Sequence, residues 1–237
     1  MIYVTSDIHG YPLPDFLRLL DRARFSDSDE LIVLGDVVDR NGDGGIAMLR
    51  WMLQQDNVRL ILGNHEAMLL ACQFLFNEIT DINLAKLDRM QIASLAHWMR
   101  NGAESTLKAL RSLFLRDQET AWGIVDYLLD SPLYETVEVP ERSFVLTHAG
   151  LGNFRPDKKL SEYTADELIW YRPKPEERFF QDRITVFGHT PTNYYGAEYA
   201  RRMLETPTWI DIDTGAGQGW PPMLLRLEDL TPFYQQE

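Results

Sequence analysis

Five short apolar runs, each typical of a β-strand, end in residues that commonly bind metal ions. Four of the five histidines lie at these ends, together with three aspartates and one asparagine. Because ligands of an open α/β sheet bind beyond the carboxyl ends of its strands, we expect these side chains to meet at one rim. They would supply enough ligands for two metal ions. The runs with their endings are Met1–Ser6 with Asp7-Ile8-His9-Gly10, Leu31–Leu34 with Gly35-Asp36-Val37-Val38-Asp39-Arg40, Val58–Leu62 with Gly63-Asn64-His65-Glu66, Phe144–Leu146 with Thr147-His148-Ala149-Gly150, and Ile184–Phe187 with Gly188-His189-Thr190-Pro191.

Most of these motifs are ambiguous when taken alone, since an Asp-x-His pair or a single histidine is as readily structural as metal-binding. The crowding of Asp36 and Asp39 at one strand end is more specific, because neighbouring carboxylates repel each other without a cation. Asn64 can ligate a metal without adding charge, and the adjacent His65 is then available for proton transfer. The conjunction of all five motifs predicts a dinuclear metal site.

Apolar spacing predicts an alternation of strand and helix over the first 65 residues, with helices at Leu13–Ala23 and Gly45–Gln55. Residues 66 to about 130 carry helical patterns, which we interpret as a helical insertion beside the sheet. His97, the fifth histidine, lies there beside Trp98 without an acidic neighbour, so we expect it on the helix surface or in packing, and Trp98 in the core. The clearest helices of this part are Glu66–Glu78, Ile92–Arg100 and Glu104–Leu115.

Strands resume after the insertion, and a polar segment at 151–183 is expected to form a long loop over the site, with a short helix near Ala165–Tyr171. The further strands expected are Tyr134–Val139, Arg142–Leu146, Thr208–Asp213 and Met223–Leu227.

Composition limits the size and the partners of the molecule. The 237 residues are expected to form one domain, 1–237. A formal charge of −13 argues against binding to nucleic acid or to anionic lipid. No apolar run approaches a membrane span, and the first residues lack the pattern of a signal peptide. The single Cys72 excludes an internal disulfide and suits a cytoplasmic protein.

The order and spelling of the motifs resemble a known family. D-x-H-G, G-D-x-x-D-R, G-N-H-E, H-x-G and G-H-T, spread over roughly residues 1–225, are similar to the calcineurin-like metallophosphoesterases. The spelling G-D-V-V-D-R with G-N-H-E most resembles the bacterial PPP-type phosphoprotein phosphatases. The resemblance implies an α/β fold with a β-sandwich flanked by helices, and two metals at the sheet edge. Strand–helix alternation is compatible with that arrangement but does not derive it.

The resemblance also implies roles for individual residues. Asp36 bridges both metals, and His189 is shared toward the first metal, which Asp7 and His9 hold. Asn41 and Ala149 replace glycines of the family pattern without removing a ligand. The complete implied ligand set is Asp7, His9, Asp36, Asn64, His148 and His189.

Four further positions match catalytic and phosphate-binding residues of the family. His65 matches the general acid, and Asp39 the carboxylate that orients it. Arg40 matches a phosphate-binding arginine, and Trp170-Tyr171-Arg172 fits a W-x-R element whose arginine also binds phosphate. The alternative for Arg172 is an ordinary loop arginine at a proline boundary.

The function implied is hydrolysis of phosphomonoesters by a hydroxide that bridges two metals, on a serine/threonine phosphoprotein or a small phosphoester. Ligands of nitrogen and oxygen suit manganese, iron, zinc or cobalt, and we expect manganese. One alternative is a dinucleoside-polyphosphate hydrolase, which shares much of the motif set and the G-H-T-P spelling. The spellings at Asp39 and Glu66 favour the phosphoprotein phosphatase. A second alternative, a non-catalytic metal-binding scaffold, is disfavoured by the intact ligand set and His65.

Overall fold

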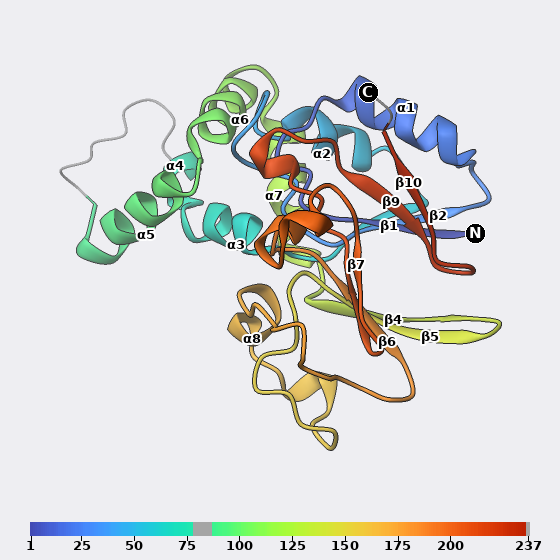
Figure 1. Cartoon of the computed structure of the whole chain (residues 1–237). Coiled ribbons are helices and arrows are strands. Elements are labelled where there is room, and N and C mark those ends of the chain that lie inside the picture. Colours follow the sequence, from blue (N-terminus) through green and yellow to red (C-terminus); the bar gives the residue numbers. More distant parts are fainter. Residues whose placement is uncertain (78–86, 236–237) are drawn as a thin grey trace.

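The computed structural model describes residues 1–77 and 87–235, and two five-stranded sheets form its centre (Figure 1). The first sheet contains three parallel strands, β1 (Ile2–Thr5), β2 (Glu30–Val33) and β3 (Val58–Leu60). β9 (Met223–Arg226) pairs antiparallel with β1, and β10 (Thr231–Tyr234) pairs antiparallel with β9. The strand order is β10-β9-β1-β2-β3. The chain's first and last strands therefore belong to the same sheet.

The second sheet has the order β4-β5-β6-β8-β7. Its centre is parallel and consists of β5 (Arg142–Thr147), β6 (Ile184–Phe187) and β8 (Trp209–Asp211). The edge strands β4 (Tyr134–Val139) and β7 (Leu204–Glu205) run antiparallel to their neighbours. Both sheets are therefore mixed. Of the parallel strands that lead into predicted site residues, β1, β2, β5 and β6 are interior strands, whereas β3 is an edge strand.

The alternation of side chains along the strands explains how the sheets pack. Leu31 and Val33 of β2 face the helices, whereas Ile32, between them, and Leu34, just beyond the strand, face the second sheet. A second apolar cluster therefore lies between the two sheets and includes Phe144 of β5. The predicted sandwich flanked by helices is confirmed.

Helices cover the outer face of the first sheet, and Figure 1 shows α1 and α2 above it. α1 has an amphipathic spacing that buries Phe16, Leu19 and Leu20, and it ends where Arg24 adopts the left-handed conformation. α5 begins at a capping box formed by Asp88 and Gln91. The helices that contribute to this apolar cluster are α1 (Leu13–Ala23), α2 (Ile46–Met52), α3 (Asn64–Ala71), α4 (Phe74–Asn77), α5 (Arg89–Arg100), α6 (Glu104–Arg116) and α7 (Gln118–Asp130).

The segment after β5 covers the outer face of the second sheet with a third apolar cluster. α8 (Ala165–Ile169) contributes Leu168 and Ile169, which pack with Phe187 and Trp209 of the sheet. The expected short helix is thus present and ends two residues earlier than predicted. None of the helices in the described ranges is long and apolar enough to span a membrane.

Some elements differ from the sequence prediction. β7 and β10 were not predicted, and α7 lies in the region of predicted helical pattern but was not bounded there. The helix expected at 66–78 is two helices, α3 and α4. Its last predicted residue, Glu78, lies outside the described residues. α3 also begins earlier, at Asn64, so the G-N-H-E motif starts the helix instead of preceding it.

Candidate metal centre

The five predicted strand ends come from two sheets and meet at one place. The loops after β1 and β2 are joined by backbone hydrogen bonds from Asp7 to Gly35 and from His9 to Asp36. The loops after β5 and β6 are joined by a bond from Gly188 to His148. The side chains meet at one place as expected, but the expectation that they come from one open sheet is wrong. Apolar runs mark strands but do not say which strands pair. Every predicted ligand is at most 5% exposed: Asp7, His9, Asp36, Asn64, His148 and His189.

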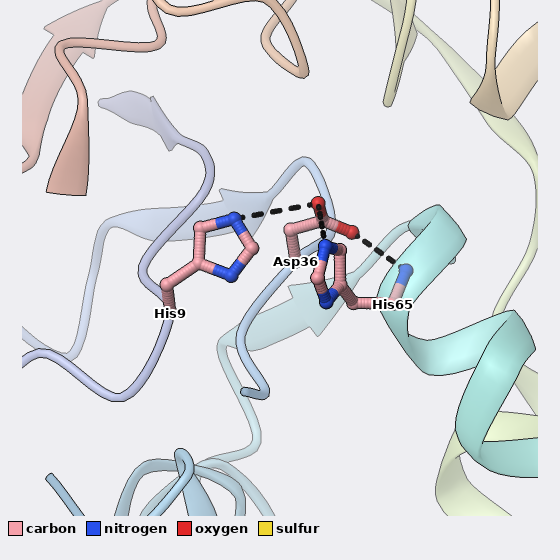
Figure 2. Close-up of side chains that lie close together, drawn as sticks. All are labelled: His9, Asp36 and His65. Atoms are coloured by element: carbon pink, nitrogen blue, oxygen red, sulfur yellow. Dashed lines mark hydrogen bonds and ion pairs between the residues drawn. The ribbon is translucent and has the colours of Figure 1, made fainter. Parts of the chain in front are cut away.

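Asp36 belongs to two groups of potential ligands. Figure 2 shows the first group, in which Asp36 lies beside His9 and His65. Its Oδ2 is 3.5 Å from His9 Nε2 and 3.8 Å from His65 Nε2. Its Oδ1 is 3.4 Å from His148 Nε2 and accepts the backbone N–H of His65 at 2.9 Å. The two carboxylate oxygens therefore face different imidazoles, which is the geometry required of a ligand that bridges two ions.

The second group gathers around His148. Its Nε2 lies 2.9 Å from Asn64 Oδ1 and 3.2 Å from His189 Nδ1. The ring of His189 therefore lies with the second group. Its backbone N–H donates to Oδ2 of Asp7 at 2.8 Å, and Asp7 lies beside His9 of the first group, with Oδ1 3.8 Å from His9 Nε2.

Hydrogen bonds on the far side of two rings leave the inner nitrogens available. His148 Nδ1 is 2.7 Å from the carbonyl of Leu34, and His9 Nδ1 is 2.9 Å from the carbonyl of Val38. A carbonyl accepts only from a protonated nitrogen, so the neutral rings carry their protons there and Nε2 keeps a lone pair. His189 Nε2 is buried without a partner among the described residues. These donors fit two divalent ions.

Burial makes the cluster electrostatically costly without cations. The pKa of Asp36 is raised well above its ordinary value by burial, and the neighbouring carboxylates of Asp7 and Glu66 raise it further. Burial lowers the pKa of both His9 and His189. Divalent ions would stabilise the deprotonated carboxylates and neutral imidazoles that these shifts concern, so the electrostatics also fit metal binding.

The loops that carry the site are conformationally strained. Six of the ten non-glycine residues with positive φ in the described ranges belong to the motifs. Such conformations persist only where the surrounding structure holds them, and they concentrate at functional sites. The six, with φ between 45° and 75°, are Asp7, His9, Asp36, Asp39, Arg40 and His189.

Glu66 holds the loop that carries Asp36. Its carboxylate is fully buried and accepts four backbone N–H groups, from Asp36, Gly63, Val37 and Val38, at 2.8–3.1 Å. The sequence analysis used Glu66 only as part of a motif spelling. The sequence signal for this role was the position of Glu66 three residues after Gly63, because a glutamate on the first turn of a helix commonly accepts backbone N–H groups.

His65 and Asp39 form the predicted pair, with His65 Nδ1 2.6 Å from Asp39 Oδ2. The helical insertion completes the environment of Asp39. The indole N–H of Trp98 donates to Asp39 Oδ2 at 2.8 Å, and the Thr106 hydroxyl donates to Oδ1 at 2.7 Å. Trp98 is fully buried as expected, but its bond to Asp39 was missed, as was Thr106. The available signal was that a buried indole N–H needs an acceptor.

Both arginines predicted to bind phosphate lie at the edge of the buried cluster and are exposed. Arg40 Nη2 is 3.2 Å from His65 Nε2. Arg172 Nη1 donates to the carbonyl of His189 at 2.9 Å and to Thr190 Oγ1 at 3.1 Å. A guanidinium has five N–H groups, so these two bonds leave donors for a phosphate.

The two departures from the family pattern are accommodated. Asn41 Nδ2 donates to the carbonyls of His9 and Ala216, both at 2.9 Å, and so links the first motif to the loop before β9. The loop near His148 is also hydrogen-bonded, since Ala149 N donates to the carbonyl of Leu168. The backbone turns here through Asp39 and Arg40, which adopt the left-handed conformation, whereas Asn41 does not.

The chain belongs to the calcineurin-like phosphoesterase family, whose model matches residues 1–212. Members of this family depend on two metal ions, and the donor groups around Asp36 agree with that requirement. The protein is therefore a member of a family of phosphoester hydrolases.

Relatives include proteins described as symmetrical bis(5'-nucleosyl)-tetraphosphatases. The protein from Salmonella paratyphi B is 34% identical over 81% of this chain, and that from an Acidovorax species is 28% identical over 74%. The matched part spans only 57% and 50% of those two proteins.

Solved structures share the fold at low sequence identity. A putative diadenosine tetraphosphatase matches with a TM-score of 0.64 and 18% identity, over 99% of this chain and 92% of that one. A serine/threonine phosphatase from Saccharomyces cerevisiae matches with a TM-score of 0.57 and 15% identity, over 100% and 80%. These structures confirm the fold.

We predict that replacing Asp36 by Asn lowers metal content at both positions, from about two ions per chain to about one or fewer, because each oxygen faces a different group. Elemental analysis of the purified, manganese-loaded protein measures this. Asp27→Asn, which changes an exposed carboxylate, is the matched control. Two ions per chain together with normal turnover in the Asp36 variant would show that the bridging assignment is wrong.

Proposed function

We propose that the protein is a metal-dependent hydrolase of dinucleoside tetraphosphates. The observation that carries this proposal is the 34% identity, over 81% of the chain, to a protein described as a symmetrical bis(5'-nucleosyl)-tetraphosphatase. The site supports a phosphoester substrate, with two ligand groups sharing Asp36 and two arginines at their edge. This reverses the preference drawn from motif spelling, which ranked the dinucleotide substrate second.

A serine/threonine phosphoprotein remains the second candidate substrate. The G-D-V-V-D-R and G-N-H-E spellings favour it, and in the structure Asp39 and Glu66 are integral parts of the site. Both residues, however, hold other protein groups and do not themselves select between two leaving groups. The spelling therefore carries less weight than similarity along most of the chain.

The ligands divide into two sets around Asp36. Asp7, His9 and Asp36 would hold one ion, and Asp36 with Asn64, His148 and His189 would hold the other. When bound, two such ions lower the pKa of the attacking water and hold phosphoryl oxygens. The intact set, with His65 beside it, argues against a non-catalytic scaffold. Oxygen and nitrogen donors suit manganese, which we propose as the working metal.

Arg40 and Arg172 would bind the phosphate oxygens. A planar guanidinium matches the geometry of phosphate and stays charged. Both arginines are exposed and lie at the edge of the buried ligand cluster. Because the chain has a formal charge of −13, they would supply the local positive charge that an anionic substrate needs at the site.

His65 would donate a proton to the leaving oxygen, and Asp39 would orient its ring. Burial lowers the pKa of His65 to about 2, with the charge of Arg40 contributing, and burial raises the pKa of Asp39 to about 6. A bound phosphate dianion would oppose the shift of His65, because a nearby negative charge favours the imidazolium. Trp98 and Thr106 fix Asp39 from the other side.

A substrate panel under one manganese condition tests the proposed function. We expect diadenosine tetraphosphate to be cleaved to two molecules of ADP, with a kcat/KM at least roughly tenfold above that for serine and threonine phosphopeptides. Chromatography of the nucleotides distinguishes ADP from a mixture of ATP and AMP. Faster turnover of the phosphopeptides would favour a serine/threonine phosphoprotein as the substrate. Absence of turnover with every phosphoester would favour the non-catalytic scaffold.

His65→Asn tests the assignment of the proton donor. An alkoxide needs a proton in order to leave, whereas p-nitrophenolate, like the ADP released from a dinucleoside tetraphosphate, is an anion stable enough to leave without one. We expect a loss of ~10²–10⁴-fold, or roughly 3–5 kcal/mol of barrier, on an alkyl phosphate and a clearly smaller loss on p-nitrophenyl phosphate. Metal content should stay near that of the wild type. Equal losses at full metal content would assign His65 to positioning, and loss of metal would make it a ligand.

Arg172→Ala should raise KM, lower kcat or both, and weaken inhibition by inorganic phosphate by roughly tenfold or more, because a charged hydrogen bond is lost. Steady-state kinetics with a phosphate titration measures this. Arg178→Ala is the control, since Arg178 is exposed and donates to backbone carbonyls of its own loop. Kinetics of the Arg172 variant that match the control would leave Arg172 as a loop residue.

A further inference from the structure

Trp170 is an exposed aromatic residue placed against the metal centre. Trp170 directly follows α8 in the sequence and is 36% exposed. His189, which its ring contacts, is only 5% exposed. The two rings meet edge to face, with centroids 6.0 Å apart and an interplanar angle of 88°. A large aromatic ring thus lies beside the buried polar cluster and is open to solvent, where a ligand of the centre could contact it.

His97 also contacts Trp170. Its ring centroid is 5.8 Å from that of Trp170, and it comes from α5 in the helical insertion. The sequence analysis expected His97 on the helix surface or in packing, and the structure shows both, since His97 is exposed and packs against Trp170. Trp170 therefore contacts both the insertion and the metal centre.

The backbone around Trp170 is fixed as well. Ala149 N donates to the carbonyl of Leu168, and Gly150 N donates to the carbonyl of Tyr171, so both sides of Trp170 are tied to the loop that carries His148. α8 starts at a capping box, in which Glu167 accepts the backbone N–H of Thr164. The backbone that carries the ring is thus held in place, which reduces the entropy lost when a ligand packs on the ring.

We propose that Trp170, supported by His97, is the surface on which a nucleobase of the substrate stacks. The proposal rests on the proposed function, since only a nucleotide substrate brings a base to this site. Two residues further on, Arg172 reaches His189, so phosphate contacts and the aromatic ring occupy adjacent positions on the same segment. An uncharged contact is also useful here, because a chain with a charge of −13 repels a polyphosphate outside the immediate site.

The test compares two inhibitors that differ by the nucleoside, ADP and inorganic pyrophosphate, with hydrolysis of p-nitrophenyl phosphate as the reporter. Base–aromatic stacking corresponds to roughly 5- to 150-fold in affinity. We expect Trp170→Leu to raise the inhibition constant of ADP by a factor in this range and to leave that of pyrophosphate within about twofold. Trp170→Phe, which keeps a flat ring, should retain most of the affinity for ADP.

The possible outcomes separate this proposal from the one on which it rests. If Trp170→Leu raises the inhibition constants of ADP and pyrophosphate by the same factor, Trp170 only supports the fold of the site, and the stacking proposal is wrong. If a phosphopeptide loses affinity while ADP does not, the ring belongs to a peptide site. Turnover of diadenosine tetraphosphate by the wild-type protein is measured separately, so its absence would overturn the proposed function and not the affinity comparison.

Discussion

The burial of Asp36 between two groups of imidazoles is the interaction on which the rest of the site depends. An isolated buried carboxylate is strongly destabilising, and here burial and the nearby acids raise the pKa of Asp36 well above its ordinary value. Among the described residues, Asp36 forms no ion pair with an arginine or a lysine. Its carboxylate oxygens lie 3.4–3.8 Å from imidazole nitrogens instead. A cluster of this composition is stabilised by cations shared between its members, and the family's dependence on two metals supplies them.

The helical insertion contributes to the chemistry as well as to the core. Trp98 and Thr106 bind the carboxylate of Asp39 from α5 and α6, while Asp39 in turn contacts His65. His97, on the same helix as Trp98, packs against Trp170. One inserted segment therefore orients the proposed proton donor and supports the proposed nucleobase platform. Changes in its helices would alter turnover and substrate preference without touching a metal ligand.

Much of the site was predictable from the sequence, because each ligand follows an apolar strand directly and local patterns mark strand ends. α1 and β6 were predicted with their observed bounds for the same reason. The pairing of strands into two sheets was not derivable, since it depends on contacts between distant segments such as β1 with β9. The bonds of Trp98 and Thr106 to Asp39 span 59 and 67 residues and leave no local signature. β7, with two residues, is too short to show a period.

The central claim is that Asp36 bridges two metal ions, and anomalous diffraction from crystals grown with manganese tests it most directly. The account predicts two anomalous peaks about 3.5–4 Å apart, one beside His9 and the other beside His148, with the Asp36 carboxylate in contact with both. A single peak, or two peaks of which only one contacts Asp36, would contradict it.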